Sequence, residues 1–409
     1  MTGPTQAFLG RQPILDRGGE LMGYELLYRA SAAENVARFD NEDDASLNVL
    51  STLLGDLGAS QVLAGKQAFI NVGPGSLRDT AALGLMNPRR TVLELSREIR
   101  ATPEVLERAN MLRGIGFGVA VSAVPPLAEL DPWLSVVSHL KVDMQRVPES
   151  QLEAFVGGLR AFPPVLIAEK VETAQQMRQC IELGFQAFQG FHIARPEVMG
   201  SIKLGVSHAV LHRMVDLIGI GADTAELEAT MRQDVALCFR LLRYVAASHF
   251  GMLMHVDSLA HAIELVGPKR LSRWLQLLLT TVEPPSAAAA MLTRAAVFRG
   301  RMLEMLGAEY FEGADCDNLF LVGALSLMPA MLIQPMSRAI ANVALPESVS
   351  DALVSRQGPY GAFLDLVEAD EAGNPQQVDA MCDNLTISAG ILRRAQVSAR
   401  AAAREAAFA

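Results

Sequence analysis

The first half of the chain alternates short apolar runs with longer amphipathic stretches. Helix patterns lie between the runs, as in residues 103–114, where Pro103 suits a first helical turn and Gly114 a C-terminal stop. Parallel neighbours need helical crossovers, so this alternation predicts a parallel sheet, and about seven units in 200 residues predict a closed β/α barrel. The expected strands are Leu21–Tyr28, Ala68–Val72, Thr91–Leu95, Gly118–Val121, Val136–Val142, Val165–Ala168 and Phe185–Phe191.

The second half has a different rhythm, because the β-rich runs stop and helix signals follow one another. In residues 259–266 apolar side chains recur at helical spacing, with Asp257 or Ser258 as the expected N-cap and Gly267 as the stop. Pro268 then suits the first turn of the next helix. We therefore expect a TIM-like α/β barrel followed by an all-α domain. The expected boundaries are 1–197 for the barrel, 198–207 for a linker and 208–409 for the helical domain with its C-terminal extension.

Membrane insertion and secretion are not expected. The longest apolar run, Leu319–Ile333, is shorter than the roughly 20 residues that a spanning helix needs, and Pro329 interrupts it. It therefore predicts a buried helix. The first residues lack the basic start and apolar core of a secretory signal. These features predict a cytoplasmic protein without a membrane span.

Composition narrows the function further. The 409 residues carry 35 Lys and Arg against 45 Asp and Glu, a net charge of −10, which argues against a nucleic-acid binder that relies on general electrostatics. The four cysteines lie more than fifty residues apart, so no pair has zinc-ligand or redox spacing. We expect free thiols in a reducing compartment.

Polar side chains occur in or just after the predicted strands. Chemistry in β/α barrels sits at the C-terminal ends of the strands, and a polar group inside an apolar strand is costly unless it is paired or functional. Carboxylate and amide oxygens are ligands that Mg²⁺ or Ca²⁺ prefers, although satisfied core groups are the alternative. The residues are Glu25, Asn71, Glu94, Ser122, Lys141, Asp143, Glu169, Glu172 and Gln189.

With these residues in view, residues 8–197 resemble the EAL-domain family, the bacterial phosphodiesterases that linearise cyclic di-GMP. Glu25-Leu26-Leu27 matches the Glu-Ala-Leu signature, and Arg29 matches the arginine that contacts phosphate in the family. The further matches, in chain order, are Asn71 and Glu94 for two metal ligands, Lys141-Val142-Asp143 for Lys-Ile-Asp, Ala168–Thr173 for Ala-Glu-Gly-Val-Glu-Thr, and Gln189-Gly190-Phe191 with Arg195-Pro196 for the closing segment.

The departures from the family pattern concern the metals. Where the family has two adjacent aspartates that hold and bridge two divalent ions, this chain has Ser122 and Ala123. In-line attack on a phosphodiester needs a metal-activated hydroxide and a two-metal clamp, and these side chains supply neither. The other departures are Arg97 for a glutamate, Gln186 for an aspartate and Lys170 for a glycine.

The resemblance therefore implies an inactive relative, with Lys141 and Glu172 as vestigial catalytic residues and Glu25, Asn71, Glu94 and Glu169 as vestigial metal ligands. No cofactor is expected, and Mg²⁺ or Mn²⁺ only with residual activity. Two alternatives stay open. One is a cyclic di-GMP receptor whose ligand contacts Arg29, Asp143 and Gln189, together with Lys141 and Glu169. The other is weak phosphodiesterase activity through a single metal.

The helical half raises the hypothesis of an HD-type metal hydrolase, which needs an adjacent His-Asp pair. None of the seven histidines is followed by Asp, and His208 with His212, at i and i+4, forms a weak site without a carboxylate. Residues 242–251 and 257–267 resemble the HDOD family, which lacks those ligands. Residues 320–336 and 356–369 are similar to the extension that follows when HDOD joins a degenerate EAL barrel. The resemblance implies a bacterial signalling protein that acts through contacts with other signalling proteins, with a homodimer as a further expectation.

Overall fold

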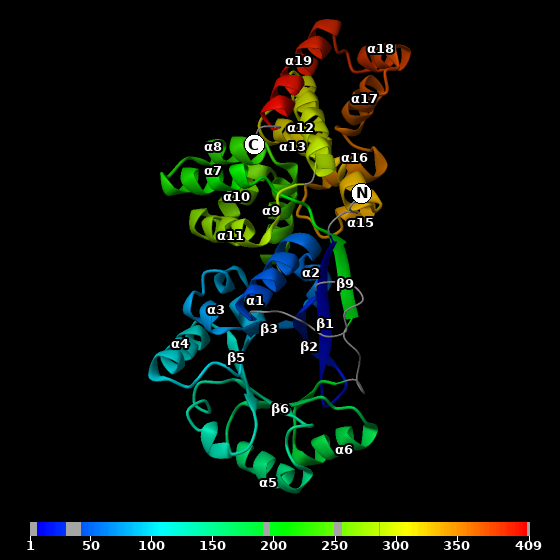
Figure 1. Ribbon diagram of the computed structural model, residues 1–409. Coiled ribbons are helices and arrows are strands. Elements are labelled where there is room, and N and C mark those ends of the chain that lie inside the picture. Colours follow the sequence, from blue (N-terminus) through cyan, green and yellow to red (C-terminus); the bar gives the residue numbers. More distant parts are fainter. Residues whose placement is uncertain (1–5, 30–41, 191–196, 249–255, 286, 407–409) are drawn as a thin grey trace. The chain divides into compact units, whose positions relative to one another are not determined.

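The computed structural model describes residues 6–29, 42–190, 197–248, 256–285 and 287–406, drawn in colour in Figure 1. The chain divides into two compact units. The barrel unit contains residues 6–53 and 59–200, and the helical unit contains residues 201–409 together with the short segment 54–58. The division is therefore not one cut along the sequence, because five residues flanked by barrel elements belong to the helical unit.

The barrel unit is built on one sheet of nine strands. Strands β2 to β8 are parallel and follow chain order, and β1 pairs antiparallel with both β2 and β8, which closes the barrel (Figure 1). The strands are β1 Gln6–Asp16, β2 Leu21–Arg29, β3 Gln67–Val72, β4 Thr91–Leu95, β5 Gly118–Ala123, β6 His139–Asp143, β7 Val165–Glu169, β8 Ala187–Phe188 and β9 Glu197–Ile202. The closed barrel that the sequence predicts is confirmed.

Two strands were not predicted. A tight turn at residues 17–20 folds β1 back on β2, where the Asp16 carboxylate accepts hydrogen bonds from the N–H groups of Gly18 and Glu20. One strand is thus antiparallel, unlike in an all-parallel β/α barrel. Strand β9 pairs with β1 and covers the first part of the segment expected to be a linker. The expected residues Phe191, Arg195 and Pro196 lie outside the described part of the chain.

Helices connect the parallel strands, as the alternating pattern predicts. Helix α4 covers the predicted residues 103–114 and begins after the N-cap Thr102, whose hydroxyl accepts from the Val105 N–H. The helical segments are α1 Glu42–Ser51, a π-helical stretch Thr52–Leu57, α2 Ala59–Leu63, α3 Pro74–Arg78, α4 Pro103–Gly114, α5 Glu149–Leu159 and α6 Ala174–Leu183. Three 3₁₀ turns, Leu83–Leu85, Pro88–Arg90 and Leu127–Glu129, complete the connections.

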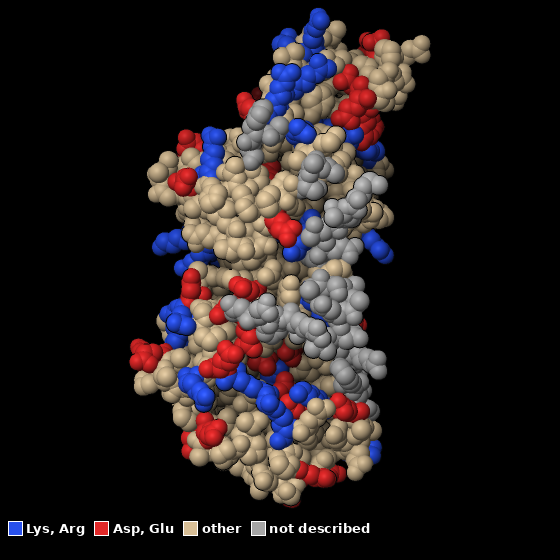
Figure 2. Space-filling model, in the orientation of Figure 1, with Lys and Arg blue, Asp and Glu red and all other residues tan. Residues whose placement is uncertain are grey.

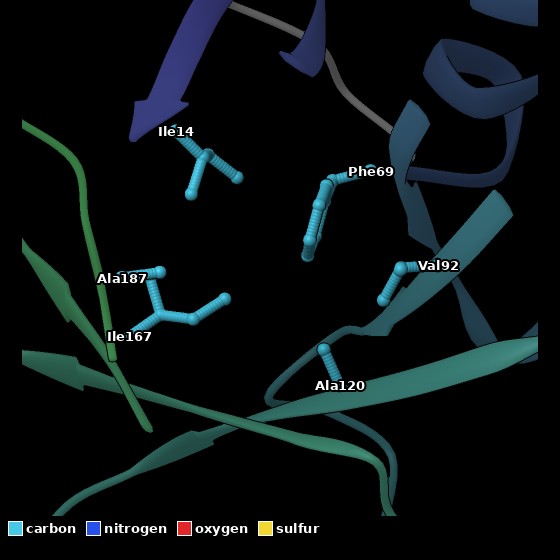
Figure 3. Close-up of a cluster of buried hydrophobic side chains, with 6 residues drawn as sticks. All are labelled: Ile14, Phe69, Val92, Ala120, Ile167 and Ala187. Atoms are coloured by element: carbon cyan, nitrogen blue, oxygen red, sulfur yellow. The ribbon is translucent and has the colours of Figure 1, made fainter. Parts of the chain in front are cut away.

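A layer of apolar side chains fills the barrel near the N-terminal ends of the parallel strands. These side chains are at most 1% exposed and point toward one another across the interior (Figure 3). Gly23 leaves room for this layer, because a Cβ there would lie 3.1 Å from the ring of Phe69. The layer consists of Ile14, Phe69, Val92, Ala120, Ile167 and Ala187. It closes the barrel below the polar residues of the site.

The helical unit contains only helices among its described elements, apart from the end of β9. The predicted helix at residues 259–266 is confirmed, with Ser258 as N-cap and Gly267 between it and the next helix. The helices are α7 His208–Gly219, α8 Thr224–Met231, α9 Val235–Ser248, α10 Leu259–Val266, α11 Pro268–Thr281, α12 Ala287–Gly307, α13 Ala314–Leu325, α14 Met328–Leu332, α15 Met336–Ala339, α16 Glu347–Ser355, α17 Gly361–Glu371, α18 Pro375–Asn384 and α19 Ala389–Glu405.

The apolar run Leu319–Ile333 forms two helices with a break before Pro329, so Pro329 takes the first turn of α14. Residues 318–325 are all buried in the helical unit. Among the described residues, none of the helices combines the length and the apolar character that crossing a membrane requires.

Candidate functional site

A polar layer lies directly above the apolar layer of the barrel. Side chains alternate between the two faces of a strand, so the residue two positions further on points to the same interior. Moving two residues toward the C-terminal end of each parallel strand leads from Phe69 to Asn71, Val92 to Glu94, Ala120 to Ser122, His139 to Lys141, Ile167 to Glu169 and Ala187 to Gln189. In the antiparallel β1 the same step runs backward, from Ile14 to Gln12. The strand period thus gathers these polar groups on one level.

Lys141 is the centre of this layer. Its ammonium group lies 2.6 Å from a carboxylate oxygen of Glu94, 2.7 Å from Glu169 and 3.1 Å from Glu25, and its side chain is fully buried. The three carboxylates come from β4, β7 and β2, and their side chains are only 11–14% exposed. A single buried cation therefore holds three acids that the sequence predicts as a group of metal ligands and active-site residues.

Amide side chains complete the hydrogen bonding of Glu25. Gln189 donates to its Oε2 at 2.5 Å, and Asn71 donates to its Oε1 at 3.3 Å. Gln189 also donates to the side-chain oxygen of Gln12 at 3.0 Å. Sequence reasoning missed Gln12 because it did not predict β1. The usable signal was its position two residues before Ile14, an apolar residue in a run that precedes a turn.

The environment separates the pKa values of Glu25, Glu94 and Lys141. Burial raises the pKa of Glu94 to about 8, since the Lys141 charge opposes this only in part and the neighbouring carboxylates of Glu25 and Glu169 add to it. Burial also acts on Glu25, but the Lys141 charge and the hydrogen bonds from Gln189, Lys141 and Asn71 outweigh it, so its pKa is lowered. Burial alone would lower the pKa of Lys141, but the three neighbouring acids raise it well above its usual value. Lys141 is thus charged and Glu94 mostly protonated at neutral pH.

A second group of polar residues lies at the end of β6. The fully buried Asp143 carboxylate accepts a hydrogen bond from Lys170 at 2.7 Å, and the Arg97 guanidinium lies 3.7 Å from it. Lys170 adopts φ +56°, a left-handed backbone that suits the glycine which the family pattern has there. Gln145 joins this group to Glu172, because its backbone N–H donates to Asp143 and its side chain to Glu172 at 2.7 Å.

Arg29 and Gln189 are held in place by close backbone approaches. Arg29 ends β2, is 4% exposed and donates to the Tyr28 carbonyl at 2.8 Å, and a Cβ at Gly10 would lie 3.2 Å from its guanidinium carbon. Next to Gln189, a Cβ at Gly190 would meet the Val171 backbone at 2.2 Å. Only glycine allows this approach, in which the Gln189 carbonyl accepts from the Val171 N–H at 3.0 Å.

The side chains at the end of β5 do not fit a centre of two divalent ions. Ser122 pairs in register with Lys141, and the next residue, Ala123, is buried and has no ligand atom. Within the described residues, no three His, Cys, Asp or Glu side chains are grouped to hold a metal ion.

Two histidines of the helical unit, His208 and His261, make structural contacts, and His212 is exposed. His208 contacts the Val282 carbonyl oxygen through Nε2 at 2.7 Å, and His261 lies 3.3 Å from the Asp257 carboxylate. His192, His249 and His255 lie outside the described residues.

Comparison with known proteins finds relatives along the whole chain. The chain is 25% identical over 401 residues to the cyclic di-GMP phosphodiesterase CdgJ of Vibrio cholerae, which covers 96% of this chain and 91% of CdgJ. It is also 24% identical over 377 residues to the uncharacterized protein YuxH of Bacillus subtilis, which covers 90% of this chain and 91% of YuxH. Both matches span the barrel and the helical unit. No family model matches the chain.

Solved structures with EAL domains cover about half of the chain. The EAL enzyme Bd1971 with cAMP and cyclic di-GMP bound has a TM-score of 0.39 at 17% identity, over 46% of this chain and 62% of its own. The YkuI protein of Bacillus subtilis, with cyclic di-GMP and calcium, has a TM-score of 0.39 at 19% identity, over 47% of this chain and 56% of its own.

Proposed function

We propose that this chain is a cyclic di-GMP signalling protein of the EAL type whose barrel does not hydrolyse the nucleotide and whose output is contact with other proteins. The observation that carries the proposal is the pair Ser122 and Ala123 at the end of β5, where the family pattern has two adjacent aspartates. The whole-length similarity to a cyclic di-GMP phosphodiesterase supports the signalling pathway.

The physical argument concerns the mutual repulsion of two metal ions. Two divalent cations a few ångströms apart need bridging carboxylates, because negative charge between them offsets their repulsion. Ser122 and Ala123 bring no negative charge at that position. The barrel therefore keeps a polar interior without the clamp that phosphodiester cleavage needs.

Hydrolysis of cyclic di-GMP, followed by chromatography with Mg²⁺ or Mn²⁺, tests the proposal. We expect no conversion by the natural chain, and metal-dependent formation of the linear dinucleotide by the double variant Ser122→Asp with Ala123→Asp. Conversion by the natural chain that disappears in Glu25→Ala would overturn the proposal. Conversion that persists in Glu25→Ala identifies a contaminating enzyme.

The helical unit is the proposed output module and resembles the HDOD family. In support, the four most exposed large apolar side chains among the described residues all lie in this unit: Ile220, Met291, Ile333 and Val397, each at least 63% exposed. A second copy is one expected partner. Light scattering at micromolar concentration should give the mass of two protomers, and a mass of one protomer would count against self-association.

A second candidate function is a receptor for cyclic di-GMP, with weak single-metal hydrolysis as its variant. The full-length match to CdgJ favours it. Arg29, Asp143 and Gln189 are the proposed ligand contacts, and Glu25, Asn71, Glu94 and Glu169 the proposed holders of one metal. Calorimetric titration with and without Mg²⁺ separates the cases. Heat in both titrations supports a receptor, and absence of heat in both removes this candidate.

A further inference from the structure

Helices α12 and α19 pack side by side in the helical unit, and a hollow of about 470 Å³ opens between them. Their direction follows from the two ends of α19. Near its start, the Arg394 guanidinium lies 3.5 Å from the carboxylate of Glu309, which comes just after α12. Near its end, Arg404 lines the hollow together with Arg294 from the start of α12. The two helices are therefore antiparallel, and the hollow is part of the groove between them.

Three arginines give this groove a positive charge. Arg294, Arg400 and Arg404 line the hollow with exposed side chains, and among the described residues none of the three has an ion pair or a side-chain hydrogen bond. The acid in the lining, Glu371, is already bound by Arg299 at 2.6 Å. The three positive charges are therefore available to a partner. Figure 2 shows basic side chains gathered over α19.

The charge extends along one face of α19. Arg393, Val397, Arg400 and Arg404 follow at i, i+4, i+7 and i+11, so their exposed side chains form one stripe, while the buried residues of α19 are alanines. Like charges at i and i+4 destabilise an isolated helix by about 0.2–0.5 kcal/mol. The chain as a whole has a net charge of −10, so the stripe reverses the overall sign locally and at a cost to the helix.

The floor of the groove is apolar. Ala295 and Ala403 line the hollow together with Phe298, which is half-buried. The exposed side chains of Met291 and Val397 extend this apolar surface along the two helices. An apolar floor flanked by cations is complementary to an amphipathic helix that carries acids beside its apolar face.

The spacing of the stripe favours a helix over an extended peptide. At a rise of 1.5 Å per residue, Arg393 and Arg400 are about 10 Å apart along the axis, and Arg400 and Arg404 about 6 Å. Acids seven and four residues apart on a partner helix match both steps and share one face. In an extended strand, about 10 Å is three residues, and side chains three residues apart point to opposite faces.

We propose that the groove between α12 and α19 binds an acidic amphipathic helix of a partner protein. Its carboxylates pair with the arginines of the stripe and with Arg294, and one of its apolar side chains enters the hollow above Phe298. The inference rests on the proposed output by protein contact, for which it names the surface and the chemistry of the partner.

A synthetic helix tests the groove on the full chain. The probe is a fluorescent alanine-based peptide of about 18 residues with Glu, Leu, Glu and Glu at i, i+4, i+7 and i+11. Fluorescence anisotropy should give a Kd of about 100 μM or below, about tenfold tighter than for a scrambled peptide of the same composition. Absence of saturation by about 1 mM, or equal binding of the scrambled peptide, would overturn the proposal.

Matched variants assign the binding to this groove. Arg400→Gln with Arg404→Gln should weaken it about tenfold or more, because two charge-assisted hydrogen bonds are lost. The control is Arg273→Gln with Arg338→Gln, which removes two exposed charges of the same unit outside the groove and should stay within about threefold. Ala403→Lys adds a charge but fills the hollow, so binding should fall. Tighter binding by Ala403→Lys, or equal losses in the two double variants, would contradict the assignment.

Competition separates the other partners that a basic surface could have. Vesicles of phosphatidylglycerol and phosphatidylcholine in equal parts, and a single-stranded oligonucleotide, are added to the peptide complex. Tighter binding of either one than of the peptide would make a membrane or a nucleic acid the partner and overturn the proposal. The nucleotide assay is independent: peptide binding that fails in a chain without hydrolysis removes only the groove, whereas hydrolysis by the natural chain removes the proposed function.

Discussion

Each unit of the chain holds one nearly buried cation surrounded by three carboxylates. In the barrel unit this is Lys141, with acids on three strands. In the helical unit it is Arg232, 9% exposed, whose guanidinium lies 2.7 Å from Glu228, Glu304 and Asp317. These three acids come from α8, α12 and α13, and Asp317 is 34% exposed.

The two clusters differ in how the cation is held. The planar Arg232 fork also lies over the Phe320 ring at 4.7 Å, so it links helices with directed bonds and a ring contact. Lys141 is a point charge in a closed ring of strands, where a compact ion of similar charge fits the same space. The helical cluster therefore links helices. The barrel cluster instead has the form of an ion-binding site in which the Lys141 ammonium group is the cation. Four predictions test this contrast.

The largest effect is expected for Lys141→Met. Three buried carboxylates then lose their cation, which should destabilise the barrel unit by about 3–5 kcal/mol. Mn²⁺ should restore part of the melting temperature, since Glu25, Glu94 and Glu169 surround the place of the ammonium group. The measurement is thermal unfolding with and without Mn²⁺. If Mn²⁺ stabilises the natural chain as much as the variant, Lys141 is not the resident cation.

Arg232→Met should have a smaller effect and no rescue by metal. One of its three carboxylates, that of Asp317, is 34% exposed and can recover water, so we expect a loss of about 1.5–3 kcal/mol. Each unit holds one of the two tryptophans, Trp133 in the barrel unit and Trp274 in the helical unit. In a Trp274→Phe background the remaining fluorescence therefore reports unfolding of the barrel unit, and in a Trp133→Phe background that of the helical unit. Rescue of Arg232→Met by Mn²⁺ would remove the contrast between the clusters.

Glu94→Gln should change how stability depends on pH. The folded-state pKa of Glu94 is about 8 against an ordinary value of 4.5, so its contribution is complete below pH 4.5 and is lost as pH rises through 8. Glutamine resembles the protonated acid and does not ionise. The melting temperature of the variant, relative to the natural chain, should therefore rise between about pH 5 and about pH 9. The exposed Glu107→Gln on α4 is the control and should show no such trend.

Lys170→Gly should have the smallest effect. Glycine relieves a left-handed backbone that costs other residues about 1–2 kcal/mol, but the ion pair to Asp143 is lost and the unfolded chain gains freedom. Because Lys170 is 52% exposed, the pair contributes only about 0–1 kcal/mol. Denaturant unfolding should give a stability within about 1 kcal/mol of the natural chain. A loss well beyond that would place Lys170 with Lys141 as a required cation.

The sequence predicts the parallel strands and most of the polar layer. Both follow from the alternation of side chains along a strand, because every second residue points to the barrel interior. It does not predict the hairpin partner β1, and Gln12 is lost with it. The distances around Lys141 also escape sequence reasoning, since three strands far apart in the chain set them through the closure of the barrel. The break between α8 and α9 also depends on a contact far away in the chain. There Asp234 accepts from the Ser207 N–H at 2.6 Å, a contact with a residue outside both helices.

The segment 54–58 has a consequence for synthesis on the ribosome. Its buried Asp56 pairs at 2.5 Å with Arg240, which follows 184 residues later. At a translation rate of about 5–20 residues per second, Asp56 emerges roughly 10–40 s before its partner. During that interval the nascent barrel carries a charged stretch with no place to dock. A messenger truncated after codon 200 would make this temporary exposure permanent.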